Sequence, residues 1–317
     1  MSRVSSWGAI VLAFASYVHA EDFPVRPIRL IVPFSAGGPA DGIARLAAAQ
    51  MSAGWNQQVV VDNRGGGSGI IATEIVARAA ADGYTLLCIS SAFTINASLF
   101  PKLPYDSVKD FTAVAPLSAG PALLVVHPSV PVKTMKELIV LAKAKPLVYG
   151  SSGTGSPGHI TFELIRRMSG VDITHIPYKG MGPALVDLLG GQVQMAAPGI
   201  SVAIPHLKSG RLRPIAVTSA KRWATVPEVP TVAEAALPGF ESVLWYGIIG
   251  PARMSPALVA RINAEASRAM ENADLREKLE ASGMGPMKMT PPDYASYIRA
   301  EIAKHAKVVK ESGARPD

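Results

Sequence analysis

Alternation of apolar, β-branched runs with longer amphipathic segments is the feature that most constrains the fold of this chain. The runs PIRLIVPF (27–34), QVVVDN (58–63) and YTLLCIS (84–90) predict strands. The segments between them, 37–51 and 68–81, have the spacing of helices. Strands that alternate with helices of this length are typical of βαβ units around a parallel sheet. The fold class is therefore predicted to be α/β.

The same alternation begins again after residue 121. Strands are predicted in ALLVVHP, PLVYGSS, DITHIPY, QVQMAAP and LRPIAVTS, and helices at 134–145, 158–170 and 182–191. The last part of the chain, at 255–283 and 291–313, is predicted to be helical. Two sets of βα units, each with its own sheet, predict two domains.

The chain is predicted to cross between the domains twice, in PLSAGPA (116–122) and in ESVLWYGIIG (241–250). The first lobe is then discontinuous, and a hinged cleft for a ligand separates the lobes. The predicted bounds are 21–120 plus 246–317 for the first lobe and 121–245 for the second.

The first twenty residues differ from the rest. Arg3 is the only charge, an apolar run follows at 7–18, and Val18-His19-Ala20 ends it with a small-residue site. This is the pattern of a secretory signal peptide over residues 1–20, removed after Ala20, which predicts a periplasmic protein. A membrane anchor is the alternative, but a spanning helix needs roughly 20 apolar residues.

Composition excludes several classes of function. Lysine and arginine outnumber acids by a net +7, but they are scattered, with no basic stripe for nucleic acid. The excess instead favours an anionic ligand. Cys88 is the only cysteine, so neither an intrachain disulfide nor a cysteine zinc site is possible. The six histidines lack ligand spacing, and no metal or cofactor is expected.

Three glycine-rich turns share the order strand, small-residue loop, helix. They are PFSAGGPAD (33–41), NRGGGSG (63–69) and SSGTGSPGH (151–159). Glycine lets the backbone approach a ligand closely, and the N–H groups at a helix start attract an anion. Such turns lie at the carboxyl ends of parallel strands, where ligands bind. The first and third turns, one from each lobe, are predicted to face each other across the cleft.

The turn SSGTGSPGH has three interpretations. A dinucleotide fingerprint needs an acid at the end of the next strand, but Asp172 precedes that strand. A secreted serine hydrolase using Ser156 and His159 lacks the G-x-S-x-G elbow and an evident acid. A carboxylate cradle needs no base, although Ser156, like Asp41 in the first turn, also suits a helix cap. The cradle consists of backbone N–H groups with Ser152, Thr154, Ser156 and His159.

Several segments together resemble the Bug-type solute receptors, the extracytoplasmic binding proteins of tripartite tricarboxylate transporters. Among them are RPIRLIVPFSAGGPAD, GSSGTGSPGHITFEL, HIPYKGMGPALVDLLGGQVQ and PEVPTVAEAALPGFE, and the likeness covers nearly the whole mature chain. It implies a type II two-lobe periplasmic-binding fold with parallel-type sheets flanked by helices. It also implies a non-enzymatic receptor, expected to be a monomer, that delivers a small organic acid to membrane transporter subunits. A ligand-binding module of a signalling system is the alternative that the sequence leaves open.

The resemblance also implies the site. The carboxylate-holding turns of the family map onto 34–41 and 151–159, and many relatives carry an acid where this chain has Pro198. Such an acid pairs with an amino group, so its absence favours an unaminated carboxylate, aliphatic or aromatic. No catalytic residue is expected. The candidate ligand-binding residues are Phe34, Ser35, Gly37, Gly38, Asp41, Ser90, Ser91, Ser152, Thr154, Gly155, Ser156, His159, Pro198 and Gly199.

Overall fold

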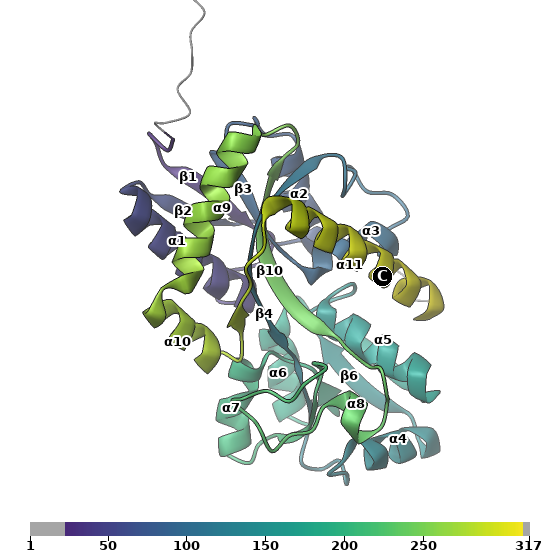
Figure 1. Cartoon of the computed structure of the whole chain (residues 1–317). Coiled ribbons are helices and arrows are strands. Elements are labelled where there is room, and N and C mark those ends of the chain that lie inside the picture. Colours follow the sequence, from purple (N-terminus) through teal and green to yellow (C-terminus); the bar gives the residue numbers. More distant parts are fainter. Residues whose placement is uncertain (1–22, 313–317) are drawn as a thin grey trace, which may run out of the picture.

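Two sheets, each covered by helices, form the two lobes of the chain in the computed structural model, which describes residues 23–312 (Figure 1). The predicted signal peptide lies outside these residues. The two-lobe α/β fold expected from the sequence is confirmed.

The first lobe contains a six-stranded sheet in the order β11-β4-β10-β3-β1-β2. Strands β1, β2 and β3 are parallel, whereas β10 runs antiparallel to both β3 and β4. The strands are β1 (Ile28–Val32), β2 (Val59–Asn63), β3 (Thr85–Ser90), β4 (Phe111–Pro121), β10 (Val243–Pro251) and β11 (Gly285–Pro286). The helices are α1 (Pro39–Trp55), α2 (Ile70–Ala77), α3 (Ser91–Leu99), α9 (Pro256–Glu271), α10 (Ala273–Ala281) and α11 (Pro291–Ser312).

The two faces of this sheet build two apolar clusters, because successive strand residues point to opposite sides. Leu30 packs with α1 and α9 around Met51 and Ile262. Ile31, the next residue, packs on the other face with Phe93 of α3 and with α11. The sheet is therefore buried on both sides, and its strands read as nearly continuous apolar runs.

The second lobe contains a five-stranded sheet in the order β7-β6-β8-β5-β9. Its strands are β5 (Leu123–Val126), β6 (Leu147–Ser151), β7 (Ile173–Pro177), β8 (Met195–Ala196) and β9 (Arg213–Val217). Its helices are α4 (Met135–Ala144), α5 (Pro157–Ser169), α6 (Met181–Leu189), α7 (Ile200–Lys208) and α8 (Val232–Ala235).

The chain passes between the sheets in two neighbouring strands, β4 and β10. They pair along their length, from Phe111 with Pro251 to Pro121 with Val243. A chain that leaves a lobe in one strand and returns in the adjacent one must run in the opposite direction. This is why both sheets are mixed and not purely parallel.

Helix α3 was not predicted from the sequence. Its segment SAFTINASL has no polar face, since nearly all of its residues are buried. Helix α11 crosses from the first lobe toward the second, where it lies beside α3 and α5 (Figure 1). Residues from these three helices form what we call the interlobe cluster: Ile95 and Leu99 of α3, Ile160 of α5, and Val308 and Val309 of α11.

In the described range 23–312 we find no helix that combines the length and the apolar character needed to cross a bilayer.

Candidate ligand-binding cleft

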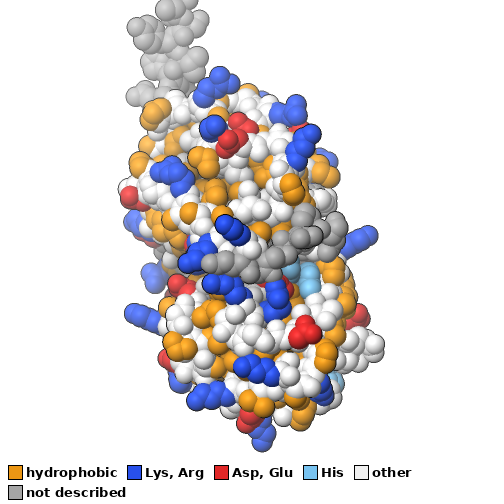
Figure 2. Space-filling model, turned by 90° about the vertical axis from the view of Figure 1, so that its right-hand side faces the viewer, with side chains coloured by type: hydrophobic (Ala, Val, Ile, Leu, Met, Phe, Trp, Pro, Cys, Tyr) orange, Lys and Arg blue, Asp and Glu red, His pale blue; other side chains and the backbone are white. Residues whose placement is uncertain are grey.

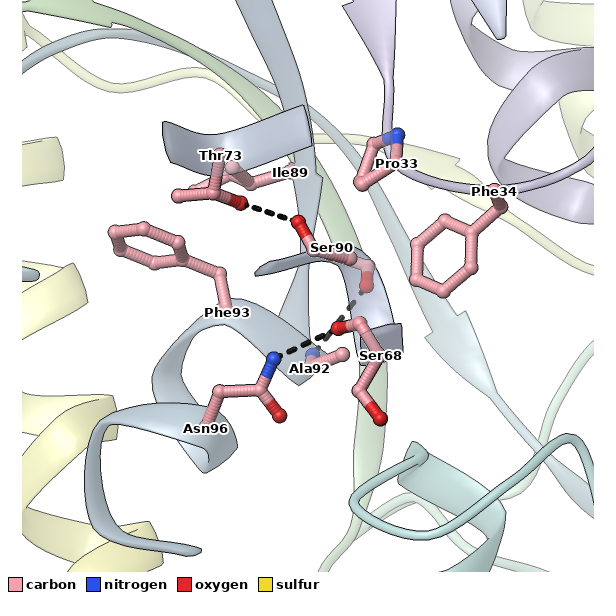
Figure 3. A pocket seen from close by; sticks show the side chains of 10 residues that line it. Pro33, Phe34, Ser68, Thr73, Ile89, Ser90, Ala92, Phe93 and Asn96 are labelled. Carbon is pink, nitrogen blue, oxygen red and sulfur yellow. Dashed lines mark hydrogen bonds between the residues drawn. The ribbon is translucent and has the colours of Figure 1, made fainter. Parts of the chain in front are cut away.

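The carboxyl ends of β1 and β3, and the turn after β2, converge on a cavity of about 10 Å³ in the first lobe (Figure 3). That is room for about one water molecule. The ten lining residues carry no charge: Pro33, Phe34, Ser68, Gly69, Thr73, Ile89, Ser90, Ala92, Phe93 and Asn96. The sequence predicted Phe34 and Ser90 at this edge but not Ser68 or Asn96, because α3 was missed and the 63–69 turn had not been included in the site.

The first predicted turn leads into α1 with an open helix start. Gly38 is the N-cap residue and makes no side-chain cap bond, and Pro39 follows it. Backbone N–H groups at such a start attract anions. Ser35 and Gly37 are exposed beside it, and Gly38 is half-buried. This end of α1 can therefore receive a carboxylate.

The side chain of Asp41 stabilises this turn through hydrogen bonds. Its buried carboxylate accepts a hydrogen bond from the Gly37 N–H at 2.9 Å and one from Arg45 Nε at 3.0 Å. Burial opposes ionisation, but the bonds from Arg45 and Gly37 outweigh it and hold the pKa of Asp41 below its usual range. The side chain is thus occupied in shaping the turn, so its candidate role as a ligand contact stays a prediction.

Ser156, in the second-lobe turn, has the geometry of a helix cap. Its Oγ accepts the His159 N–H at 3.3 Å and donates to Ser151 Oγ at 3.2 Å. The ring of His159 is engaged elsewhere, since its Nδ1 accepts the Gly155 N–H at 3.1 Å. These contacts do not assemble a serine nucleophile with its base.

Much of the predicted N–H cradle is used inside the turn itself. The Gly153 N–H donates to Ser151 Oγ at 3.1 Å, and the Ser156 N–H donates to Gly153 O at 3.1 Å. Within the described part of the chain, the N–H groups of Ser152 and Gly158 have no such partner. These two groups are the donors that the turn can still offer to an anion.

An aromatic column supports the turn from within the second lobe. The ring of His159 stacks on His175 with 4.2 Å between centroids, and His175 stacks on Tyr149 at 4.9 Å. Because Nδ1 of His159 is an acceptor, the proton of the neutral ring lies on Nε2. His159 is buried, so its ring packs beneath the turn in the interior of the second lobe.

The start of α7 adjoins α5, but it is not open: the Ser201 N–H of α7 already donates to Ser282 O at 3.3 Å. Gly199 is its N-cap residue, without a side-chain cap bond. A Cβ built on Gly158 would lie 3.8 Å from Ala197 O, which places the start of α5 beside the β8–α7 turn. Pro198 is buried between them, and its carbonyl accepts the Leu123 N–H at 2.8 Å. The predicted residues at 151–159 and 198–199 thus meet at one edge of the second lobe.

Ser90 and Ser91 start α3 at the edge of the first lobe. Ser90 Oγ caps the helix by accepting the Ala92 N–H at 3.3 Å. Ser91 Oγ is buried and has no hydrogen-bond partner among the described residues. A donor or acceptor from a ligand or a water molecule would satisfy it.

A polar contact joins the two edges. Ser68 Oγ, in the first lobe, donates to Thr154 O of the second at 3.5 Å. Both lobes also carry basic side chains near this level: Figure 2 shows Lys and Arg spread over both lobes on the face it draws, with Asp and Glu among them. Within residues 23–312 no group of three or more His, Cys, Asp or Glu side chains is placed to hold a metal ion.

Comparison with known proteins gives a consistent family. The sequence profile of the tripartite tricarboxylate transporter family receptors matches residues 43–314. Protein BugT from Bordetella pertussis is 37% identical over 305 residues, which are 95% of this chain and 94% of that protein. A protein from the tcbD–tcbE intergenic region of Pseudomonas sp. is 36% identical over 91% of this chain and 87% of its own length.

Solved structures agree with this result. The structure of R. palustris Rpa4515 with adipate superposes with a TM-score of 0.88 at 38% identity, covering 93% of this chain and all of the other. MatC from Rhodopseudomonas palustris with bound malate gives a TM-score of 0.82 at 34% identity, with 90% of this chain and all of that one covered. The aliphatic sulphonate-binding protein SsuA from Escherichia coli, at 13% identity and a TM-score of 0.54, shares the fold alone.

Proposed function

The chain belongs to the family of tripartite tricarboxylate transporter receptors, and on that premise we propose that its cleft holds one small organic carboxylate without covalent chemistry. The receptor delivers this acid to the membrane subunits of its transporter. The observation that carries the proposal is that the α1 start at Gly38 has no side-chain cap and that the Ser152 and Gly158 N–H groups have no hydrogen-bond partner among the described residues. Positive helix ends with free N–H groups suit an anion.

Neutral donors hold the acid in this proposal. The Ser152 and Gly158 N–H groups and the α1 start bind carboxylate oxygens, and Ser91 Oγ binds a ligand atom or a bridging water. The uncharged first-lobe edge around Phe34 and Phe93 contacts the apolar part of the ligand, and the small cavity beside it has room only for about one water molecule. Two related structures hold adipate and malate, both unaminated carboxylates.

The preference for an unaminated ligand rests on the charges near the turns of both lobes. Pro198 offers no carboxylate to an ammonium group, and Asp41 is already paired with Arg45. An amino group entering the cleft would lose its hydration without a charged partner, which costs free energy.

We also propose that the mature protein starts near Glu21, acts in the periplasm and works as a monomer, with 21–120 plus 246–317 and 121–245 as its lobes.

A thermal-shift panel tests the proposal. Adipate, malate, benzoate, aspartate and glutamate are compared, because a ligand at 100 times its Kd stabilises the folded state by about 2.7 kcal/mol. We expect a shift with at least one unaminated acid and none with the two amino acids. A shift with aspartate or glutamate alone would contradict the unaminated class. Turnover of an ester substrate that is lost in Ser156→Ala would restore the hydrolase alternative.

A matched pair of glycine variants locates the site. Gly158→Ala places a methyl beside a free N–H of the second-lobe turn, where the Cβ has ordinary contact distances of 3.8 Å. Gly182→Ala, in α6, adds the same methyl in open space. We expect Gly158→Ala to weaken binding of the acid found in the panel about tenfold and Gly182→Ala to leave it unchanged. If both variants bind the acid with equal affinity, the carboxylate does not lie at the start of α5.

A further inference from the structure

Gly155, in the second-lobe turn, lies directly against α3 of the first lobe. A Cβ built on it would sit 2.6 Å from Leu99 Cδ2 and 3.1 Å from Asn96 Oδ1. Its φ of +75° is also in the left-handed region. Glycine is therefore required here by the approach of the opposite lobe, and not by the approach of a ligand.

Asn96 holds the neighbouring part of the same surface. Its buried carboxamide donates from Nδ2 to Ser68 O at 2.8 Å (Figure 3). Ser68 has a left-handed φ of +53°, which an L residue keeps only where its surroundings fix it. From this turn Ser68 Oγ reaches Thr154 O across the cleft. Two successive residues of the second-lobe turn, Thr154 and Gly155, are thus received by one surface of the first lobe.

The interlobe cluster continues this surface away from the cleft. Leu99 belongs to it, together with Ile160 on the first turn of α5. Leu99 does not line the cavity of the first lobe. An effect of Leu99 on a bound acid is therefore indirect, through the position of the α5 turn or of α3 itself.

We propose that Leu99 and Asn96 are positioning residues of the receptor. They receive Gly155 when the lobes close and so hold the Ser152 and Gly158 N–H groups at the ligand. The inference rests on the proposed function, since it concerns closure of that same cleft. In this proposal the contact forms on closure, and it therefore slows release of the ligand and leaves the rate of encounter unchanged.

A bump-and-hole cycle measures this contact, with adipate as the probe. In Gly155→Ala the new methyl meets Leu99, and we expect Kd to rise about tenfold or more through faster release. Adding Leu99→Ala opens space for the methyl and should recover most of that loss. Gly170→Ala is the control: its φ of +67° imposes the same left-handed strain at the other end of α5, with nothing within 4 Å of the Cβ. We expect its Kd to stay within about twofold of the parent. An effect of Gly170→Ala equal to that of Gly155→Ala, or no recovery in the double variant, would overturn the proposal.

A disulfide trap tests the surface with and without saturating adipate, because oxidation captures the closed arrangement whenever the protein samples it. The native Cys88 is fully buried, and burial raises its thiol pKa to about 12, so it does not compete. Leu99→Cys with Gly155→Cys should form a bridge under mild oxidation, read as a loss of two free thiols in the monomer. The pair Leu99→Cys with Gly170→Cys should not, since a helix the length of α5 separates the sites by roughly 20 Å. If Leu99→Cys with Gly155→Cys forms no bridge, the proposed contact between the lobes is wrong. If the bridge forms but the protein binds no carboxylate, the contact between Gly155 and Leu99 is supported and the proposed function is wrong.

Discussion

At the scale of single residues, several polar groups that were predicted to contact the ligand form hydrogen bonds within their own turns. Ser156, His159 and Asp41 were expected to meet the carboxylate, yet each has a partner within its own loop. Buried polar groups without partners cost free energy, so a turn that must persist in the empty receptor satisfies most of its own donors. The groups left over are the ones available for binding.

Ser156→Ala separates these two roles. We expect the free energy of unfolding to fall by about 1 kcal/mol, because the His159 N–H loses its cap. Urea unfolding measures this loss, and Ser255→Ala, which removes the equivalent cap of α9 in the first lobe, is the control. Calorimetric titration with adipate should give a similar Kd for both variants. A tenfold loss of affinity in Ser156→Ala with unchanged stability would assign the hydroxyl to the ligand.

Asp41→Asn should show a stability loss that depends on pH. The pKa of Asp41 is lowered in the folded protein, so its contribution is present above the unfolded value near 3.8 and is lost as pH falls through the folded value. We expect the variant to be less stable by about 1–2 kcal/mol at pH 7 and the difference to narrow at pH 3. Urea unfolding at both values tests this, with the exposed Asp172→Asn as control. A difference that is the same at pH 3 would exclude the charged form as its source.

At the scale of elements, α11 ties the first lobe to the region between the lobes through a buried polar contact. His305 Nδ1 lies 2.9 Å from Thr94 Oγ1 of α3, and Glu301 Oε2 accepts a bond from Trp245 Nε1 at 3.1 Å. Burial lowers the pKa of His305 to about 4, against the attraction of Glu301 and with the help of Lys304. The ring is therefore neutral where α11 packs on α3.

Lowering the pH should weaken the packing of α11 on α3 and reduce the stability of the protein. Since the folded pKa lies below the unfolded value near 6.5, stability is lost as pH falls from 6.5 to about 4. We expect His305→Gln to lose less stability than the parent over that range, by on the order of 2–3 kcal/mol. Chemical unfolding at pH 7, 5.5 and 4.5 measures the difference, and His206→Gln on α7 is the control. Parallel pH profiles for parent and His305→Gln would contradict the assignment.

At the scale of the whole molecule, two adjacent strands connect the lobes, and we expect the lobes to move about them. Because β4 and β10 pair throughout the crossing, bending them changes the cleft without breaking either sheet. Contacts such as that of Ser68 with Thr154 join the lobes in this structure. They can separate at small cost, since the Ser68–Thr154 bond is long and near the limit for a hydrogen bond.

Ligand binding should therefore make the protein more compact. Small-angle scattering with and without a saturating acid from the panel is expected to show a smaller radius of gyration in the bound form. The oxidised Leu99→Cys, Gly155→Cys protein gives the reference profile for a closed form. An empty protein whose profile already matches that reference would contradict closure on binding.

The sequence alone determined the elements whose signal is local. The strands β1, β2 and β3, the amphipathic helices of both lobes and the positions of the glycine turns follow from side-chain spacing and backbone freedom, which are encoded within a few residues. The family resemblance also rested on these turns in their order, and the comparisons confirm it. The predicted site residues around 34–38 and 151–159 each lie at the edge of their own lobe, where a parallel strand ends and a helix begins. That the two turns face each other across a ligand stays a prediction.

Only the tertiary structure decided what each polar group does. Helix α3 escaped prediction because burial on all sides removes the periodicity by which a helix is recognised. Ser68 lies 28 residues before Asn96, and Gly155 lies 59 residues after Asn96 and 56 after Leu99, so nothing in the local sequence states that they meet. Whether a glycine serves a ligand or an opposite lobe, and whether a serine caps a helix or binds an acid, depends on neighbours that only folding brings within a few ångströms.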